Sequence, residues 1–319
     1  MQDQSNPHGM FLRQLLSHQP TASAFFKDII PESMQQTLDI TALEISKDQF
    51  IDSELENQLS DMLFRVYSKN LMPAYIYLLF QHKGNPEPLM SYLLFRYMER
   101  IWEQTINQGL IGHLPVVVPV VIYNGSTPWN VSTQFSKLFG TISGLDNALP
   151  DFEYIMYDLS QFSELDFSDS PILSTGIHLL KAIHDNDFED QLPHLLNPLK
   201  QCIENDYTKR FLSFVIQYIC GASKMSENDI ETVMDEIFSK TVKDIYYHVH
   251  EQLFFQGVVH QAREGILDIL TVRFDTIPSK IIETIHAIDE IDIMKILHKQ
   301  AVTSTDIDEF EEVLEMMLY

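Results

Sequence analysis

The stretch LSDMLFRVYSKNLMPAYIYLLFQHKG, residues 59–84, decides the fold of this chain. It holds two runs rich in β-branched and aromatic residues, 59–67 and 74–82, joined by a short connection. Two such runs separated by a short loop are typical of an antiparallel β-hairpin. The second run ends in Gln-His-Lys at 81–83, so we expect one end of the hairpin to carry reactive side chains.

The two faces of this hairpin differ in polarity. Side chains alternate along a strand, and the even-numbered residues are mostly apolar, so we expect their face to be core. The odd-numbered residues include Asp61, Gln81 and Lys83, and we expect their face to be a polar surface of the sheet. A turn near residues 70–72 predicts that Asp61 lies opposite Gln81.

The polar residues at this end suit metal-assisted hydrolysis of a phosphodiester. Mg²⁺ prefers oxygen ligands, which the Asp61 carboxylate, the Gln81 amide oxygen and the His82 backbone carbonyl would supply. Lys83 would orient or help to deprotonate the attacking water and stabilise charge on the phosphate. A structural alternative stays open, in which Asp61 forms a salt bridge with Arg65 or Lys83, while Gln81 and Lys83 are ordinary polar residues of a solvated strand end. The His82 ring falls on the apolar face, where we expect a buried core histidine.

The segments around the hairpin predict a mixed sheet followed by helices. Helical spacing occurs at 8–18, 22–30 and 87–107, and strands are expected at 41–45 and 152–159. A further strand at 116–123 contains Pro119, which predicts an unpaired edge or a bulge there. We therefore expect an α/β domain over residues 1–165 and an all-helical region over 166–319. The helices expected in that region are 171–185, 209–220, 227–239, 241–256, 259–275, 279–287, 291–299 and 305–318.

The charge of the chain is strongly negative and unevenly distributed. Residues 1–130 contain 8 Lys or Arg and 13 Asp or Glu, whereas residues 131–319 contain 13 and 33, a net charge of −20 out of −25. Such a surface repels a polyanion unless a local basic patch or bound cations intervene. We expect DNA to bind only at the N-terminal domain, and the acidic region to bind a protein partner or to self-associate.

Other features of the sequence predict a cytoplasmic protein. The first residues, MQDQSNPHGMF, lack the basic and then apolar pattern of a secretory signal. The longest apolar run, residues 114–123, is too short to span a bilayer. Cys202 and Cys220 do not form a Cys-x-x-Cys spacing, and we expect both to be free thiols in a reducing compartment.

The chain resembles the Rpn or YhgA-like recombination-promoting nuclease family, a branch of the PD-(D/E)XK nuclease superfamily. The resemblance covers about residues 7–165 and lies in HGMFLRQLL, LSDMLFRV, YIYLLFQHKG, LLFRYMERIW and LPVVVPVVIYNG, in that order. It implies a restriction-endonuclease-like core of α-β-β-β-α-β order with a helical C-terminal extension. The implied activity is DNA cleavage that depends on Mg²⁺ or Mn²⁺, in recombination or in a mobile element.

The resemblance also implies roles for single residues. It places the family's conserved aspartate at Asp61 and its (D/E)-x-K element at residues 81–83. Arg96 matches the arginine of the long helix, and Tyr123 the tyrosine that closes the next strand.

Two positions depart from the family pattern. Gln81 stands where the family usually has an acid, and Gly9 stands where the opening helix usually has aspartate. Asp61 is then the one clear anionic ligand, unless Glu44, Glu54 or Glu56 compensates. The alternative is a catalytically degenerate nuclease fold that acts as a protein-interaction module.

Overall fold

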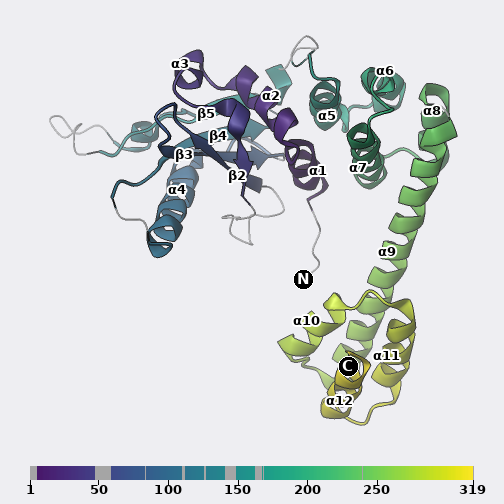
Figure 1. The fold of residues 1–319 in the computed structure, drawn as a ribbon. Helices are drawn as coiled ribbons and strands as arrows, with labels where there is room; N and C mark the ends of the chain where they lie inside the picture. The colour runs from purple at the N-terminus through teal and green to yellow at the C-terminus, as the bar shows by residue number, and fades with distance from the viewer. Residues whose placement is uncertain are drawn as a thin grey trace. The chain divides into compact units, whose positions relative to one another are not determined.

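A five-stranded mixed sheet is the central feature of the computed structural model (Figure 1). The strands lie side by side in chain order. The first three are antiparallel, whereas the third, fourth and fifth are parallel to one another. Their bounds are β1 (Glu44–Ile45), β2 (Leu59–Tyr67), β3 (Pro73–Gln81), β4 (Val116–Tyr123) and β5 (Ile155–Asp158). The structure describes residues 6–46, 59–82, 84–109, 112–125, 127–140, 149–161, 167, 169–238 and 240–318.

The hairpin of β2 and β3 forms as predicted, but in a different register. Asp61 lies opposite Leu79, and Leu59 lies opposite Gln81. The expected pairing of Asp61 with Gln81 is therefore wrong by two residues. The cause is the loop, which the hydrogen bond from Ser68 N to Met72 O closes one residue earlier than expected. A shift of two residues keeps each side chain on its face, so Asp61 and Gln81 still share one.

Helices bury both faces of the sheet. The helix α4 (Met90–Asn107) covers the odd-numbered face, where Leu63, Tyr77 and Leu79 join the core with Leu94, Tyr97 and Ile101. The prediction that this face is a polar surface is therefore wrong along most of its length, because an amphipathic helix covers it. The even-numbered face packs against α1 (Pro7–Leu16) and α2 (Gln19–Ile29), with the rings of Phe26 and Phe64 4.9 Å apart.

Pro119 lies where β4 is unpaired on one side. β5 pairs with β4 only from Val120 onward, so no ladder partner of β5 stands beside Pro119. The missing N–H of proline is tolerated at such a position, which confirms the prediction of an edge.

Helices that follow the sheet extend the same packed unit. The chain divides into two units, Met1–Ile245 and Tyr246–Tyr319, and the expected boundary at residue 165 falls inside the first. α5 (Pro171–Ala182) and α7 (Asp206–Ala222) both pack against α1. α6 (Phe188–Lys200) was not predicted, because its two internal prolines obscure the helical pattern. The remaining elements of this unit are α3 (Glu32–Gln35), η1 (Ile40–Ala42), η3 (Phe135–Leu138), η5 (Leu159–Gln161) and α8 (Glu227–Ile237).

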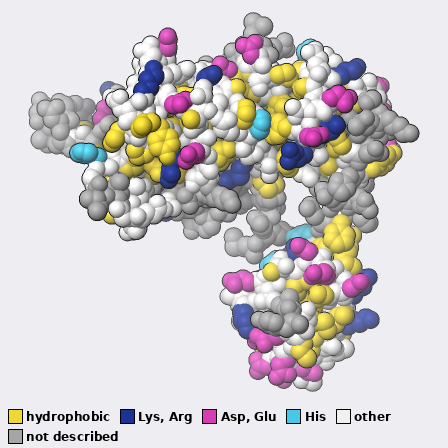
Figure 2. Space-filling model, in the orientation of Figure 1, with side chains coloured by type: hydrophobic (Ala, Val, Ile, Leu, Met, Phe, Trp, Pro, Cys, Tyr) yellow, Lys and Arg dark blue, Asp and Glu magenta, His cyan; other side chains and the backbone are white. Residues whose placement is uncertain are grey.

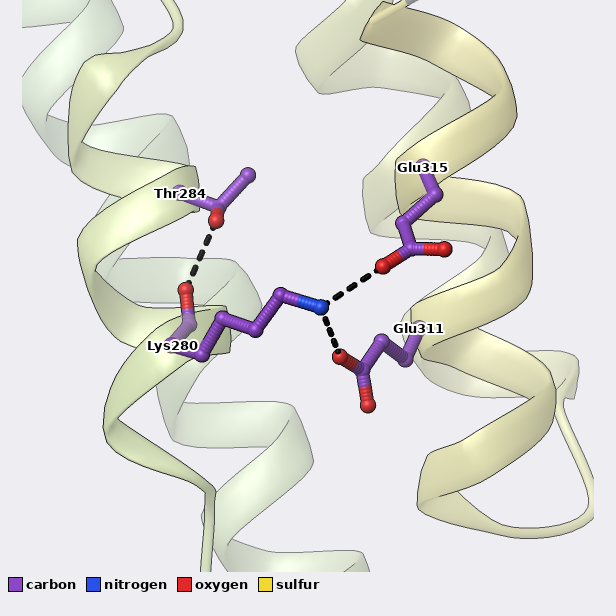
Figure 3. Close-up of polar contacts among 4 residues, drawn as sticks. All are labelled: Lys280, Thr284, Glu311 and Glu315. Atoms are coloured by element: carbon purple, nitrogen blue, oxygen red, sulfur yellow. Dashed lines mark hydrogen bonds and ion pairs between the residues drawn. The ribbon is translucent and has the colours of Figure 1, made fainter.

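The second unit is a small helical bundle. α9 (Lys240–Phe274) is one continuous helix where two were expected, and its C-terminal half packs with α10 (Ser279–Ala287), α11 (Ile291–Thr303) and α12 (Ile307–Leu318). Lys280 of α10 contacts Glu311 and Glu315 of α12 at 2.8 and 2.7 Å (Figure 3). Acidic side chains gather at one end of this unit (Figure 2). None of the described helices combines the length and hydrophobicity that a bilayer crossing requires.

Candidate functional site

Asp61 is a buried carboxylate held by two elements. It is the third residue of β2, and its side chain is 2 % exposed. The Tyr77 hydroxyl on β3 donates a hydrogen bond to Asp61 Oδ2 at 3.1 Å. Arg13 Nη2 on α1 donates to the Asp61 main-chain oxygen at 2.7 Å and lies 3.7 Å from Oδ1. Because a buried charge without partners is costly, these contacts are what allow Asp61 to stay in the sheet.

Arg13, which was not predicted, forms an ion pair with Asp61, and the predicted partner Arg65 does not. Arg65 lies opposite Glu44 in the sheet and is 3.8 Å from its carboxylate, so Arg65 does not serve Asp61. Arg13 takes this place from 48 residues away in the sequence. Lys83, the other predicted partner, lies outside the described residues.

Tyr77 is the hydrogen-bond donor that completes the Asp61 environment. Burial raises its pKa well above the ordinary value, and the negative charge of Asp61 raises it further. The hydroxyl therefore keeps its proton at neutral pH and acts as a donor to the carboxylate. Tyr77 is fully buried and is part of the core between the sheet and α4.

Gln81 carries an unusual buried oxygen. Its side chain is buried, and its Nε2 donates to the Asn85 main-chain oxygen at 2.9 Å, which fixes the orientation of the amide. Its Oε1 is also buried and accepts no hydrogen bond from the described residues. Gln81 lies on the same face as Asp61. The cross-strand partner of Asp61 is Leu79, and Gln81 is two residues further along β3. Long side chains in this diagonal position of an antiparallel pair are within reach of each other.

His82 lies on the opposite face, and its ring lies near the ring of one other histidine, His8. Its side chain is buried, which confirms the expected core position. The His82 ring is 4.9 Å from the ring of His8 on α1, and His8 is 5.0 Å from the ring of His184. His8 Nδ1 is hydrogen-bonded to the Tyr218 hydroxyl of α7 at 2.7 Å. The end of β3 is therefore supported by helices that the sequence had suggested were a separate region.

Among the described residues, the remaining acids do not complete a ligand cluster. Glu44 pairs with Arg65, four residues along β2 from Asp61. Glu54 and Glu56 lie outside the described residues. Within the described ranges, no group of three or more His, Cys, Asp or Glu is arranged to hold a metal ion. The described oxygen donors at this end are thus one carboxylate and one amide.

Residues 6–210 match the family model described as "Putative transposase, YhgA-like". The chain belongs to this family. The match covers the whole sheet and reaches into α7. No solved structure is significantly similar to the chain.

Individual relatives of the family cover the chain to different extents. Recombination-promoting nuclease RpnD of Escherichia coli O157:H7 is 28 % identical over 130 residues, which span 40 % of this chain and 50 % of that protein. Recombination-promoting nuclease RpnA of E. coli K12 is 29 % identical over 121 residues, which span 38 % of this chain and 41 % of that protein. The chain thus spans half or less of these two relatives. Inactive recombination-promoting nuclease-like protein RpnE of E. coli K12 is 23 % identical over 251 residues, which span 73 % of this chain and 82 % of that protein.

Gly9, one of the two departures from the family pattern, lies directly against β2. A Cβ atom on Gly9 would lie 2.6 Å from Ser60 Cβ, which is closer than real Cβ contacts. The Asn6 side chain also accepts a hydrogen bond from Gly9 N at the start of α1. The aspartate expected in the family therefore does not fit here unless Ser60 moves.

Tyr123 supports the loop that follows β3. It is buried, lies opposite Gln81 on β4, and its hydroxyl is 3.2 and 2.8 Å from the main-chain oxygens of Gly84 and Thr127. Arg96, the other position implied by the resemblance, is a half-buried residue of α4. Tyr123 thus has a structural role beside the candidate site.

Proposed function

We propose that this chain is a metal-dependent DNA endonuclease that acts in recombination or in a mobile element, with Asp61, Gln81 and Lys83 as its active-site residues. The observation that carries the proposal is the buried Gln81 Oε1, which has no donor among the described residues and shares a face with Asp61. Leaving a buried acceptor unsatisfied costs stability, and a cation would satisfy it. The relatives named recombination-promoting nucleases support the same role.

The order of elements supports a restriction-endonuclease-like core. α1, β1, β2, β3, α4 and β4 occur in the order that the family resemblance implies, with α2, α3 and η1 between α1 and β1. In this arrangement α1 and β2 bring Arg13 to Asp61, and β3 delivers Gln81 at its last position. The proposed active site therefore lies at the edge of the sheet where β3 ends and β2 begins.

The donor set fits Mg²⁺ or Mn²⁺ better than a softer metal. Mg²⁺ is commonly bound through one or two carboxylates, with waters and substrate phosphates as further ligands. Asp61 would supply the carboxylate, Gln81 the amide oxygen, and His82 its backbone carbonyl. A bound cation of this kind polarises the phosphate and lowers the pKa of a coordinated water.

The residues around Asp61 have supporting roles in this proposal. Tyr77 and Arg13 contact different oxygens of Asp61 and so fix the orientation of its carboxylate. Lys83 would orient the attacking water and stabilise charge on the phosphate. The apolar residues of β3 hold the strand in the core so that its end is rigid.

Cleavage of a supercoiled plasmid by the purified full chain tests this proposal. We expect nicking with Mg²⁺ or Mn²⁺ and none with EDTA. Asp61→Asn, which keeps the shape of the side chain, and Lys83→Ala should each reduce the rate by at least about 100-fold. Arg65→Gln is the matched control, since it changes a charge on the same strand away from Asp61. Wild-type rates in both active-site variants would contradict the proposal.

A second candidate function is a degenerate nuclease fold that binds a protein partner. Three observations favour it: the contact of Arg13 with Asp61, the single carboxylate at the site, and the extensive match to a relative named inactive. The acidic half of the chain would then be the binding surface for a basic partner. Titration calorimetry separates the two functions: Mg²⁺ binding that Asp61→Asn abolishes supports the nuclease, and its absence supports the degenerate fold.

A further inference from the structure

We infer that Arg13 is a phosphate ligand of the site, contacting a non-bridging oxygen of the DNA phosphate that lies against Asp61. This inference rests on the proposed function and adds a residue to it from α1. The contacts, exposure and charge of Arg13 carry the inference.

The contacts of Arg13 use only a small part of its guanidinium. A guanidinium has five N–H donors. Nη2 donates to the Asp61 main-chain oxygen at 2.7 Å, and its 3.7 Å approach to Oδ1 is longer than a hydrogen bond. The described residues offer Arg13 no other hydrogen bond or ion pair. The guanidinium is thus anchored beside the carboxylate by one bond, and most of its donors have no protein acceptor in the described part of the chain.

The exposure of Arg13 sets it apart from the carboxylate it touches. Its side chain is 31 % exposed, whereas that of Asp61 is 2 % exposed. A ligand can therefore reach the guanidinium, while Asp61 meets solvent very little. An arginine that served only to neutralise Asp61 would be expected to form a bidentate pair with its carboxylate, which the 3.7 Å separation does not show.

The charge of the chain makes such a cation necessary for binding DNA. The protein carries a net charge of −25, and the carboxylate of Asp61 adds local repulsion to an incoming phosphate. Arg65, the cation of β2 itself, is paired with Glu44 away from the site. Arginine binds phosphate oxygens through two parallel N–H groups, which lysine cannot do.

Binding of a fluorescein-labelled single-stranded oligonucleotide to the full chain tests the inference without any cleavage. Anisotropy is measured in EDTA and again with Ca²⁺, over a series of salt concentrations. The variants are Arg13→Gln, which removes the charge but keeps an amide donor for Asp61, and Arg13→Lys, which keeps the charge. Arg65→Gln is the control, because this arginine of β2 forms an ion pair of similar length with Glu44, away from Asp61.

The salt dependence distinguishes a phosphate contact from a structural tie. Loss of one phosphate contact should lower the slope of log Kd against log salt by about 0.7 for single-stranded DNA. We expect this decrease in Arg13→Gln, together with a Kd about 10- to 100-fold higher, and no change of slope in Arg13→Lys or Arg65→Gln. An unchanged slope in Arg13→Gln would overturn the inference, even if that variant were less stable.

The plasmid assay separates failure of this inference from failure of the proposed function. Wild type that cleaves, with Arg13→Gln cleaving at the same kcat and KM, contradicts the inference alone. Wild type that binds DNA through Arg13 but never cleaves contradicts the catalytic proposal and keeps the phosphate contact. Wild type that neither binds nor cleaves DNA contradicts both.

Discussion

The two ends of β2 carry ion pairs of nearly equal length in very different surroundings. Arg13 and Asp61 are 3.7 Å apart, and Arg65 and Glu44 are 3.8 Å apart. The Asp61 side chain is 2 % exposed, whereas those of Arg65 and Glu44 are 45 and 60 % exposed. Water and salt screen the second pair, but little water reaches the first carboxylate. Two ion pairs of nearly equal length are therefore expected to contribute different free energies to folding.

At the buried end of β2, the Asp61 carboxylate needs more polar partners than an exposed carboxylate does. A solvated pair such as Arg65 and Glu44 loses little when either partner is removed. A buried carboxylate must be compensated on every side, so Asp61 draws on a hydroxyl from β3 and a guanidinium from α1. A protein that keeps such a charge accepts a cost in stability, which is common where the charge has a chemical role. Stability measurements on the two ends can therefore test the comparison.

Removing the carboxylate should show the largest difference between the two ends. Asp61→Ala removes the ion-pair partner of Arg13 and leaves the buried Tyr77 hydroxyl without its acceptor, and we expect the free energy of unfolding to fall by about 2–4 kcal/mol. Glu44→Ala should change it by no more than about 0.5 kcal/mol. Urea unfolding followed by circular dichroism, in EDTA, measures both. Equal losses in the two variants would remove the distinction drawn here.

Removing a tyrosine hydroxyl compares the buried and the exposed end on one face of β3. Tyr77→Phe deletes a hydrogen bond to a buried carboxylate, so we expect a loss of about 2 kcal/mol. Tyr75→Phe is the matched control, because its hydroxyl is 3.4 Å from Arg65 at the exposed end, and its loss should stay below about 0.5 kcal/mol. In a double-mutant cycle, Tyr77→Phe should have little further effect in Asp61→Ala, whereas Asp61→Asn would keep an oxygen that accepts the hydrogen bond. Additive effects would contradict the assigned hydrogen bond.

Adding one methyl group tests how closely α1 approaches the buried end. Gly9→Ala places a Cβ 2.6 Å from Ser60 Cβ, and we expect a loss of about 1–2 kcal/mol from the forced shift of α1. Ser60→Gly in the same chain should recover part of this loss. Gly140→Ala is the control, since a Cβ there would have no neighbour within 4 Å. Thermal unfolding of the four proteins measures the effects, and equal behaviour of both alanine variants would argue against the close approach.

Alkaline pH should also weaken the buried end. Burial raises the pKa of Tyr77 in the folded state, so above its ordinary value of about 10 the unfolded chain loses the proton while the folded chain keeps it. The free energy of unfolding then falls as pH rises, by up to about 1.4 kcal/mol per pH unit for this group, and the contribution is fully present below pH 10. Tyr77→Phe should reduce this slope between pH 10 and 11.5. An identical slope in wild type and variant would contradict the assignment.

The local pattern predicted most elements of the sheet because each has a clear period or boundary. β2 and β4 begin and end as expected, and α10 has the predicted bounds. The errors have local causes as well. The helix α6 was not predicted because it contains two prolines. The continuous helix α9 was predicted as two helices because its apolar residues do not follow one face. The register was wrong because a loop of a given length can close at more than one residue.

The candidate site was predicted only in part. Alternation alone placed Asp61 and Gln81 on one face, and a register error of two residues did not affect that result. Lys83 and the backbone carbonyl of His82 stay predictions, as do Mg²⁺ and DNA. Arg13 was missed because nothing in the opening helix signals a contact with a strand 48 residues later.

The sequence by itself determined which side chains share a face of the hairpin, because the period of a strand depends only on the geometry of the chain. It also determined the uneven charge. Only the tertiary structure decided that this face is buried, that Arg13 rather than Arg65 meets Asp61, and that α5 and α7 support the first unit. These outcomes depend on how helices pack against the sheet, and packing brings together residues whose separation along the chain carries no information about their distance.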